Sequence, residues 1–337
     1  MGTNDDWLAL VTEETLEPDL PICDPHHHLW DFQLERVEPR YLIDELLNDT
    51  QSGHNIVSTV FIECGTMFRE DGPEGMKPVG EVEFANGIAA MGASGLYGKT
   101  RVAAGIVGHA DLMLGQAVGD VLDAQIAAGN GRFKGIRHMV TYDADPAVPN
   151  GRNINRPGLC MEPAYREGLK ELTRRGLTFE GWCYHPQLPE MVDLARANPD
   201  QVIIMNHMAA PLGLGEFAGR RDEIFETWKK DYADLAACPN VIAKLGGMGM
   251  HYFGFGWQDR PKPPTSDELV TATKPYFDFA IEAFGPDRCM WESNFPVDKL
   301  SCSYNIVWNS FKKISKDFSA DEKAKLFHDT ATRIYSL

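Results

Sequence analysis

The sequence places two histidines one residue apart near its N-terminus, within the stretch Cys23-Asp24-Pro25-His26-His27-His28. Apolar residues directly before this stretch predict a short strand, and the period of two along a strand puts Asp24, His26 and His28 on one face. Neutral imidazole nitrogens are good ligands for zinc, iron or manganese, so His26 and His28 could together bind one ion. Two histidines do not complete a site, so further ligands must come from elsewhere in the chain. The alternative is that the three histidines lie in a polar turn.

Short apolar runs alternate with helical patterns along the rest of the chain. After the first strand, which ends in the histidine stretch, strands are predicted at residues 57–63, 101–107, 133–139, 177–184, 202–206, 241–245 and 288–292. Helices are predicted at residues 39–53, 79–98, 115–128, 162–175, 188–197, 222–237 and 266–284, followed by a final pair of helices. Eight strand–helix units in one chain predict an α/β fold, a single (β/α)8 barrel with extra C-terminal helices. We expect an acidic lead-in at residues 1–19 and one barrel domain at residues 20–337.

Polar side chains follow most of these strands at their carboxyl ends, which is the end of such a barrel that carries the chemistry. The residues at the strand ends are His26 and His28, Glu63, His109, Arg137 and His138, His185, Asn206 and His207, Lys244, and Glu292. One histidine at a strand end is usually a packed residue, but so many potential ligands, acids and bases at one end predict an active site. Glu63 has the alternative of a salt bridge to a barrel lysine or arginine. For Lys244 we favour the neutralisation of carboxylates over a Schiff base.

Charge and cysteine usage exclude several classes of function. The formal net charge of -17 argues against nucleic acid or an anionic membrane as the main partner, because both attract basic surfaces. The N-terminal stretch lacks the profile of a signal peptide, and no apolar run approaches membrane-spanning length. Seven cysteines without a C-x-x-C pair are typical of buried thiols in a reducing compartment, so we expect a cytoplasmic protein.

Four motifs resemble one known family. Asp24-Pro25-His26-His27-His28-Leu29-Trp30-Asp31, Gly135-Ile136-Arg137-His138, Asn206-His207-Met208-Ala209-Ala210-Pro211 and Glu292-Ser293-Asn294-Phe295-Pro296-Val297 are similar to motifs of the amidohydrolase superfamily, in its amidohydrolase-2 branch of sugar-acid and pyrone-carboxylate lactonases. The resemblance runs from about residue 22 to the C-terminus. It implies a (β/α)8 barrel with metal ligands at His26, His28, His185 and His207.

The chain departs from this family at the eighth strand. Where family hydrolases usually present an aspartate before the aromatic-proline pair, this chain has Asn294, and an amide cannot take a proton from an attacking water. Glu292 lies two residues earlier, on the same face, and could bind metal or act as a base. With Glu63 it completes four histidines and two carboxylates, a set that suits one or two ions of zinc, manganese or iron. The candidate catalytic residues are therefore Glu292, Asn294 and His138.

Two features predict the character of a small-molecule substrate. Arg137 lies inside the fourth-strand motif, and its planar guanidinium could donate two parallel hydrogen bonds to a substrate carboxylate. The aromatic and glycine-rich residues 251–257 follow the seventh strand, so Phe253 and Trp257 are candidates to pack on an apolar or ring-bearing substrate. The alternative for this loop is an aromatic cluster that seals the barrel or forms a subunit contact.

The leading functional prediction is metal-assisted hydrolysis of a small ester, lactone or amide. A second hypothesis is a dinuclear iron or iron–manganese oxygenase, which the two carboxylates and the absent aspartate favour. A third is a catalytically inert partner subunit, because barrels host unrelated functions. We expect a homo-oligomer or a pairing with a related subunit.

Overall fold

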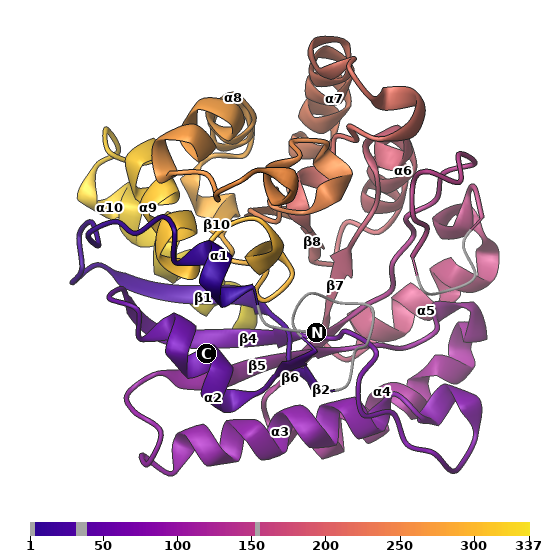
Figure 1. Cartoon of the computed structure of the whole chain (residues 1–337). Helices are drawn as coiled ribbons and strands as arrows, with labels where there is room; N and C mark the ends of the chain where they lie inside the picture. Colours follow the sequence, from indigo (N-terminus) through magenta and orange to yellow (C-terminus); the bar gives the residue numbers. More distant parts are fainter. Residues whose placement is uncertain (1–3, 32–38, 152–155) are drawn as a thin grey trace.

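The computed structural model describes residues 4–31, 39–151 and 156–337 and shows the predicted (β/α)8 barrel (Figure 1). Eight parallel strands pair in chain order, which gives the sheet order β1-β4-β5-β6-β7-β8-β9-β10. Their bounds are β1 Pro21–His27, β4 Asn55–Ile62, β5 Arg101–Gly108, β6 Phe133–Arg137, β7 Thr178–Gly181, β8 Ile203–Met205, β9 Val241–Leu245 and β10 Cys289–Trp291. The backbone N–H of His28 donates to the carbonyl of Phe295 at 2.8 Å, and a bridge between His27 and Phe295 joins the first strand to the end of the last.

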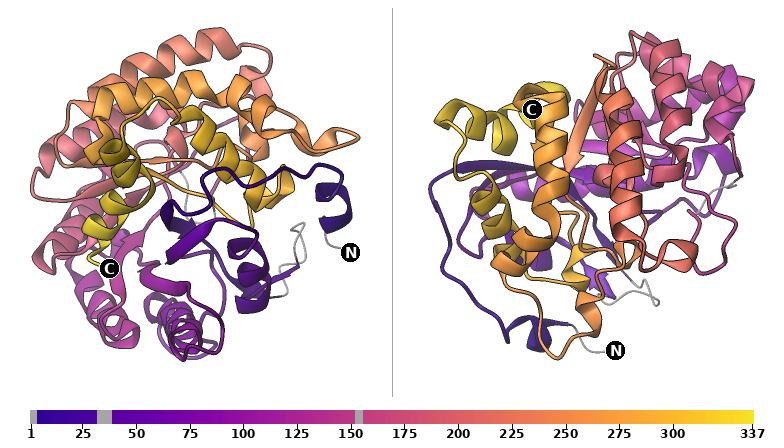
Figure 2. Two further views of the ribbon diagram at one scale, coloured as in Figure 1. Left: turned by 90° about the vertical axis from the view of Figure 1, so that its left-hand side faces the viewer. Right: turned by 90° about the horizontal axis from the view of Figure 1, so that it is seen from above.

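Helices surround the strands on the outside of the barrel, as the two views of Figure 2 show. The helices of the β/α units and of the C-terminal region are α2 Ile43–Thr50, α3 Val79–Ala93, α4 Val118–Gly129, α5 Pro163–Arg174, α6 Leu188–Ala197, α7 Arg221–Ala236, α8 Ser266–Phe284, α9 Tyr304–Ile314, α10 Ala320–Ala324 and α11 Thr330–Tyr335. Thr265 and Glu268 form a capping box that begins α8, and Ser319 and Glu322 form another before α10. A short helix, α1 Asp5–Leu8, lies within the predicted lead-in.

Some element ends differ from the prediction for local reasons. Residues 39–53 were predicted as one helix, but Arg40–Tyr41 (β3) pair with Trp30–Asp31 (β2) in a small antiparallel sheet and α2 begins only at Ile43. The predicted strand 177–184 ends at Gly181, because the chain turns there toward a 3-10 turn at His185–Gln187.

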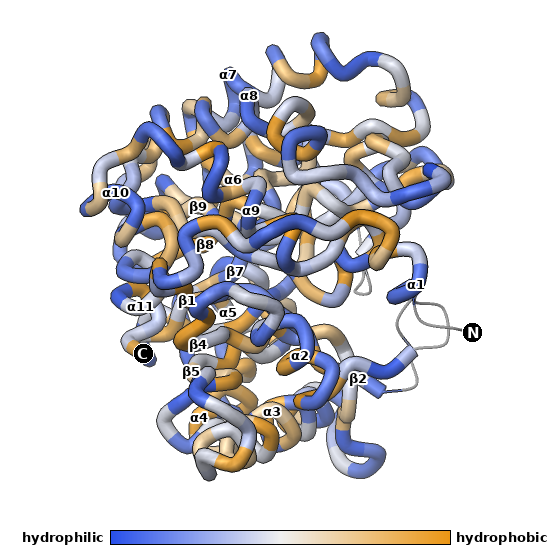
Figure 3. Tube along the Cα trace, turned by 60° about the vertical axis from the view of Figure 1, so that its left-hand side comes forward, coloured by the Kyte–Doolittle hydropathy of each residue, from blue (hydrophilic) through white to orange (hydrophobic). Residues whose placement is uncertain are grey.

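Two layers of buried apolar side chains hold the barrel together. One fills the space between strands and helices, and the smaller one fills the barrel interior with Cys23, Val60, Val107, Ile204 and Met290 among others. Figure 3 shows the hydrophobic residues concentrated along the strands and the helices that face them. Among the described residues, no helix is both long and apolar enough to cross a bilayer.

The C-terminal residues cover the amino ends of the strands. A π-helical turn at Lys325–Asp329 joins α10 to α11, and this segment contacts β1 and β10. Arg333 donates to the carbonyl of Asp287, two residues before β10 begins, and Lys134 at the start of β6 donates to the carbonyl of Ser336. This end of the barrel is therefore closed, and the opposite end, where the strand-end residues gather, is left for a site.

Candidate functional site

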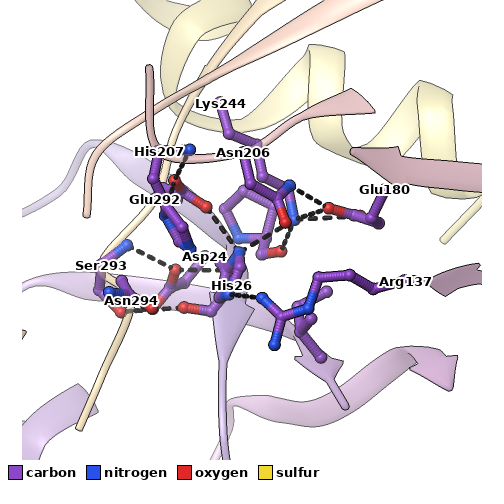
Figure 4. Close-up of polar contacts among 12 residues, drawn as sticks. Asp24, His26, Arg137, Glu180, Asn206, His207, Lys244, Glu292, Ser293 and Asn294 are labelled. Carbon is purple, nitrogen blue, oxygen red and sulfur yellow. Dashed lines mark hydrogen bonds and ion pairs between the residues drawn. The ribbon is translucent and has the colours of Figure 1, made fainter. Parts of the chain in front are cut away.

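Three buried side chains converge at the carboxyl ends of β1, β8 and β10. His26, His207 and Glu292 each offer a ligand atom, and these atoms all lie within 4.8 Å of one another. Nδ1 of His207 is 2.7 Å from Oε1 of Glu292, and Nδ1 of His26 is 2.7 Å from Oε2 (Figure 4). Of the residues that the structure describes, these three form the group suited to hold a metal ion.

The backbone near His207 is shaped to place this ring. Residues 207–210 all have positive φ, so the chain turns sharply as it leaves β8. The backbone N–H of His207 donates to Oε1 of Glu292 at 3.2 Å, which ties the turn to the end of β10. A Cβ at Gly247 would lie 2.3 Å from Nδ1 of His207, so only a glycine leaves room for the imidazole there.

Burial sets the charges of this cluster. Burial and the nearby Lys244 ammonium hold the pKa of His26 well below its usual range, and burial and Arg137 do the same for the pKa of His207. Both imidazoles are therefore neutral, which is the form that binds metal ions. Burial raises the pKa of Glu292 to about 8. A cation bound beside this carboxyl would favour its ionised form.

The donor set fits a divalent metal ion. Two imidazoles and one carboxylate are the protein ligands of many catalytic zinc sites and of non-haem iron sites. Oε2 of Glu292 is buried and has no hydrogen-bond partner among the described residues, since His26 Nδ1 lies close to it without the alignment of a hydrogen bond. A buried carboxylate oxygen without a donor costs free energy unless a further group satisfies it. A metal ion held by His26, His207 and Glu292 would do so.

Arg137 and Glu63 form a buried ion pair beside the cluster. Nε of Arg137 donates to Oε1 of Glu63 at 2.7 Å, and Nη2 donates to the backbone carbonyl of Glu63 at 2.6 Å. Nη1 of Arg137 lies 3.3 Å from Nε2 of His26. This is the salt bridge that was the alternative for Glu63, and it leaves Glu63 outside the three-ligand group. Its role as a metal ligand stays a prediction.

Asn294 is held by a carboxyl that sequence reasoning did not single out. Its Nδ2 donates to Oδ1 of Asp298 at 2.7 Å, and Oδ2 of Asp298 accepts from the backbone N–H of Gly249 at 2.8 Å. Burial raises the pKa of Asp298 to about 8. Asp298 therefore fixes the amide of Asn294 and joins the loops after β9 and β10.

Asp24 fastens the other side of the same loop. It accepts hydrogen bonds from Oγ of Ser293 at 2.6 Å, from the backbone N–H of Ser293 at 3.0 Å and from the hydroxyl of Tyr304 at 2.8 Å. Burial nevertheless raises the pKa of Asp24 to about 6. These bonds join β1 to the segment after β10 directly next to His26 and Glu292.

A pocket opens above the cluster on the carboxyl side of the barrel. Its lining combines aromatic and polar side chains, and it includes His28, Cys64, Arg137, Met139, Thr141, Asn150, Trp182, Tyr184, His207, Met250, Tyr252 and Asn294. The ring of Trp182 meets that of His207 edge-on at 4.6 Å, and Tyr184 and Tyr252 lie 6.0 Å apart. A small ring-bearing molecule could pack on these aromatic side chains while its polar groups face Arg137 and Asn294.

The other predicted ligands lie near the cluster but outside it. Nδ1 of His28 is 2.8 Å from the carbonyl of Ile62, and its ring is 4.9 Å from that of His26. Nδ1 of His185 accepts from the backbone N–H of Leu212, and its ring packs against Phe217. The ligand roles of His28 and His185 therefore stay predictions, and only that of His28 is supported by a place in the pocket lining.

Three further predicted site residues do not line this pocket. Nδ1 of His138 accepts from the backbone N–H of Leu112, and its ring lies between His109 and Tyr165. Phe253 is fully buried, and Trp257 stacks on Phe255 at 4.3 Å. Phe255 and Trp257 pack on each other, whereas Tyr252 of the same loop lines the pocket, so the substrate-binding roles of Phe253 and Trp257 stay predictions.

Sequence reasoning missed the side chains that complete the pocket and support its floor. Tyr252 and Met250 line the pocket from the loop after β9, and Trp182 and Tyr184 line it from the loop after β7. Trp182 and Tyr184 lie at the carboxyl end of the strand predicted at residues 177–184, and this position was the available signal for the second pair. Glu180, which pairs with Lys244 at 2.9 Å, lies within β7 and gave the signal of an acidic residue in an otherwise apolar strand.

Comparisons with known proteins agree with the fold. The family model described as Amidohydrolase matches residues 23–337. The chain is 36% identical to the protein y4mH of Sinorhizobium fredii, over 94% of this chain and 99% of that protein. It is 27% identical to an L-fucono-1,5-lactonase of Burkholderia multivorans, over 71% of this chain and 73% of that protein.

A solved structure supports the fold. A crystal structure of an amidohydrolase from Burkholderia multivorans with bound zinc superposes with a TM-score of 0.71 at 22% identity, and the match covers 94% of this chain and 99% of that one. The match of the family model over nearly the whole chain, together with the relative at 36% identity, decides the classification. The protein belongs to the amidohydrolase family.

Proposed function

We propose that this protein is a metal-dependent hydrolase of a small lactone that carries a carboxylate. The observation that carries the proposal is the buried group of His26, His207 and Glu292 on the floor of a pocket that Arg137 also lines. The similarity to L-fucono-1,5-lactonases supports a cyclic ester as the substrate class.

A divalent ion held by His26, His207 and Glu292 would supply a Lewis acid that polarises a carbonyl and activates water. Arg137 has five N–H groups, and Glu63 and His26 engage one on each of its three nitrogens. Two N–H groups are left on the side of the pocket, which suits a substrate carboxylate. The aromatic side chains of Trp182, Tyr184 and Tyr252 offer a surface for the substrate ring.

Glu292 is the group in this site that can accept a proton. When Oε2 binds the metal ion, Oε1, which lies beside Nδ1 of His207, is the oxygen left to take up a proton. Asn294 lies in the pocket lining, but its amide cannot take up a proton and its Nδ2 is committed to Asp298. We therefore assign the proton of the attacking water to Glu292.

The test is an assay of metal-free and metal-loaded protein on a panel of five- and six-membered lactones, with and without a carboxylate, and of the matched linear esters. Proton release in weak buffer reports hydrolysis. We expect turnover of carboxylated lactones that a chelator abolishes and zinc or manganese restores. His26→Ala and Glu292→Gln should lose it, whereas His328→Ala, which alters a partly exposed histidine paired with Asp329, should keep it.

Two results would contradict the proposal. One is equal turnover in the chelated and the metal-loaded protein, which would remove the metal from the account. The other is turnover that stops in a sealed anaerobic cell and returns when dioxygen is admitted, which would favour the oxygenase hypothesis. The Arg137–Glu63 pair gives that hypothesis no support. Glu63 is the second carboxylate that a dinuclear site would use, and here it pairs with Arg137.

A further inference from the structure

A continuous chain of buried contacts runs from the C-terminal helix to His26. Tyr335, the last residue of α11, is 1% exposed and packs in the barrel interior with Cys23, Val60 and Ile204. Its hydroxyl donates to Oε1 of Glu180 in β7. Tyr335 comes from the closed end of the barrel and therefore contacts the carboxylate of Glu180 inside the barrel.

Glu180 and Lys244 form the middle of this chain (Figure 4). The Lys244 ammonium lies 2.9 Å from Oε2 and 3.1 Å from Oε1 of Glu180, and both side chains are completely buried. Asn206, which directly precedes His207, donates to Oε2 of Glu180. The buried carboxylate thus has three partners, as a charge in the interior requires.

The Lys244 ammonium has three close contacts. It pairs with Glu180, it donates to the carbonyl of Pro25 at 2.8 Å, and it lies 3.3 Å from Nδ1 of His26. The last two contacts hold the Pro25 backbone, directly before His26, and the His26 ring itself. Any movement of the ammonium would therefore change the orientation of this ring.

We propose that Tyr335, Glu180 and Lys244 are positioning residues that fix the His26 ring for the reaction, so that the C-terminal helix supports the catalytic centre through the barrel interior. The Tyr335 hydroxyl competes with Lys244 for the same oxygen of Glu180. Without the hydroxyl, Glu180 attracts the ammonium more strongly and draws it away from His26. The effect on metal affinity rests on the proposed function, whereas the effect on the His26 ring does not.

Glu180 has a second role in this arrangement. A lysine ammonium 3.3 Å from His26 would repel a cation at that histidine, and the carboxylate that pairs with it cancels this repulsion. The pair therefore orients His26 without adding net charge to the site.

The experiment uses four variants of the full-length chain. Tyr335→Phe removes only the hydroxyl. The double variant Glu180→Gln/Lys244→Met removes the charged pair as a unit, which avoids leaving one buried charge without a partner. The third variant combines these three substitutions. Tyr232→Phe is the matched control, because Tyr232 is equally buried and, within the described parts of the chain, its hydroxyl bonds only to the sulfur of Met208, at 4.0 Å.

Two readouts separate positioning from general stability. The ring ¹⁵N signals of histidine-labelled, metal-free protein report the environment of His26, which is assigned with His26→Gln. Chelator competition measures the zinc affinity of the same preparations. We expect Glu180→Gln/Lys244→Met to shift the His26 signals and to weaken zinc binding by about 10- to 100-fold, as for other partners of metal ligands. Tyr335→Phe should act in the same direction by a smaller factor.

The decisive result is the triple variant. If Tyr335 acts through Glu180 and Lys244, adding Tyr335→Phe to the double variant changes neither the His26 signals nor the zinc affinity further. An equal, additive loss in both backgrounds would overturn the proposal, and so would a Tyr335→Phe variant that matches Tyr232→Phe in both readouts. If the unmodified protein binds no zinc, the proposed function fails while the His26 signals still decide the inference. Zinc binding without lactone hydrolysis would reject only the proposed substrate class.

Discussion

Asn294→Asp is the substitution that most directly tests how the pocket handles protons. At first sight it restores the carboxylate that related hydrolases carry at this position. In this structure, however, the side-chain nitrogen of Asn294 lies 2.7 Å from Oδ1 of Asp298, so the change places two buried carboxyls in contact. One of them must hold a proton, as in other carboxyl pairs that share a site.

The size of the effect follows from this distance. Two full charges 2.7 Å apart repel by about 6 kcal/mol at an effective dielectric constant of about 20. The folded Asn294→Asp protein therefore binds one proton more than the same protein when unfolded, because an aspartate in the unfolded chain has a pKa of about 3.9. Because the native state binds the extra proton, the free energy of unfolding falls as pH rises, by about 1.4 kcal/mol per unit above pH 4. Asp298 of the parent holds the same proton up to its pKa of about 8, so the loss relative to the parent should grow only above that pH, by about 2.7 kcal/mol between pH 8 and pH 10.

The matched control exchanges the two residues. Asn294→Asp/Asp298→Asn keeps one carboxyl and one amide, and the amide oxygen at position 298 can still accept from the backbone N–H of Gly249. Urea unfolding at pH 8 and pH 10 should show the extra loss for Asn294→Asp and not for the exchange. If Asn294→Asp follows the parent at both pH values, the contact with Asp298 does not control this site.

Three further outcomes are expected. Arg137→Lys should raise KM for a carboxylated substrate and lower the free energy of unfolding by about 1–3 kcal/mol, because it removes hydrogen bonds to the buried Glu63; an unchanged urea midpoint would contradict the ion pair. Gly247→Ala should reduce zinc content, because the new Cβ would lie 2.3 Å from Nδ1 of His207, whereas Gly219→Ala shares a positive φ without such a contact and serves as the control. Zinc at 100 times its Kd should stabilise the fold by about 2.7 kcal/mol, measured as a thermal shift that a chelator reverses.

The alternation of apolar runs and helical patterns was sufficient to predict the barrel. Each strand contributes a short buried run, and the polar residues that follow it mark the open end. His26, His207 and Glu292 were found in this way, because they directly follow or end their strands. The expectation that Lys244 neutralises a carboxylate also agrees with its pairing to Glu180.

The rest depends on features that a linear pattern does not contain. His185 directly follows its predicted strand, as His207 does, but the chain turns at Pro186 and the His185 ring packs on Phe217. In the loop after β9 no period fixes side-chain direction, so Tyr252 rather than Phe253 faces the pocket. Tyr335 lies 155 residues from Glu180, and only closure of the barrel brings them together.

The most direct test of the metal site is anomalous X-ray diffraction from zinc-soaked crystals, recorded on both sides of the zinc absorption edge. The account predicts one strong anomalous peak within bonding distance of His26, His207 and Glu292, and its loss in crystals of Glu292→Gln. A peak elsewhere in the pocket, or no peak in crystals whose protein hydrolyses lactones in solution, would contradict the account.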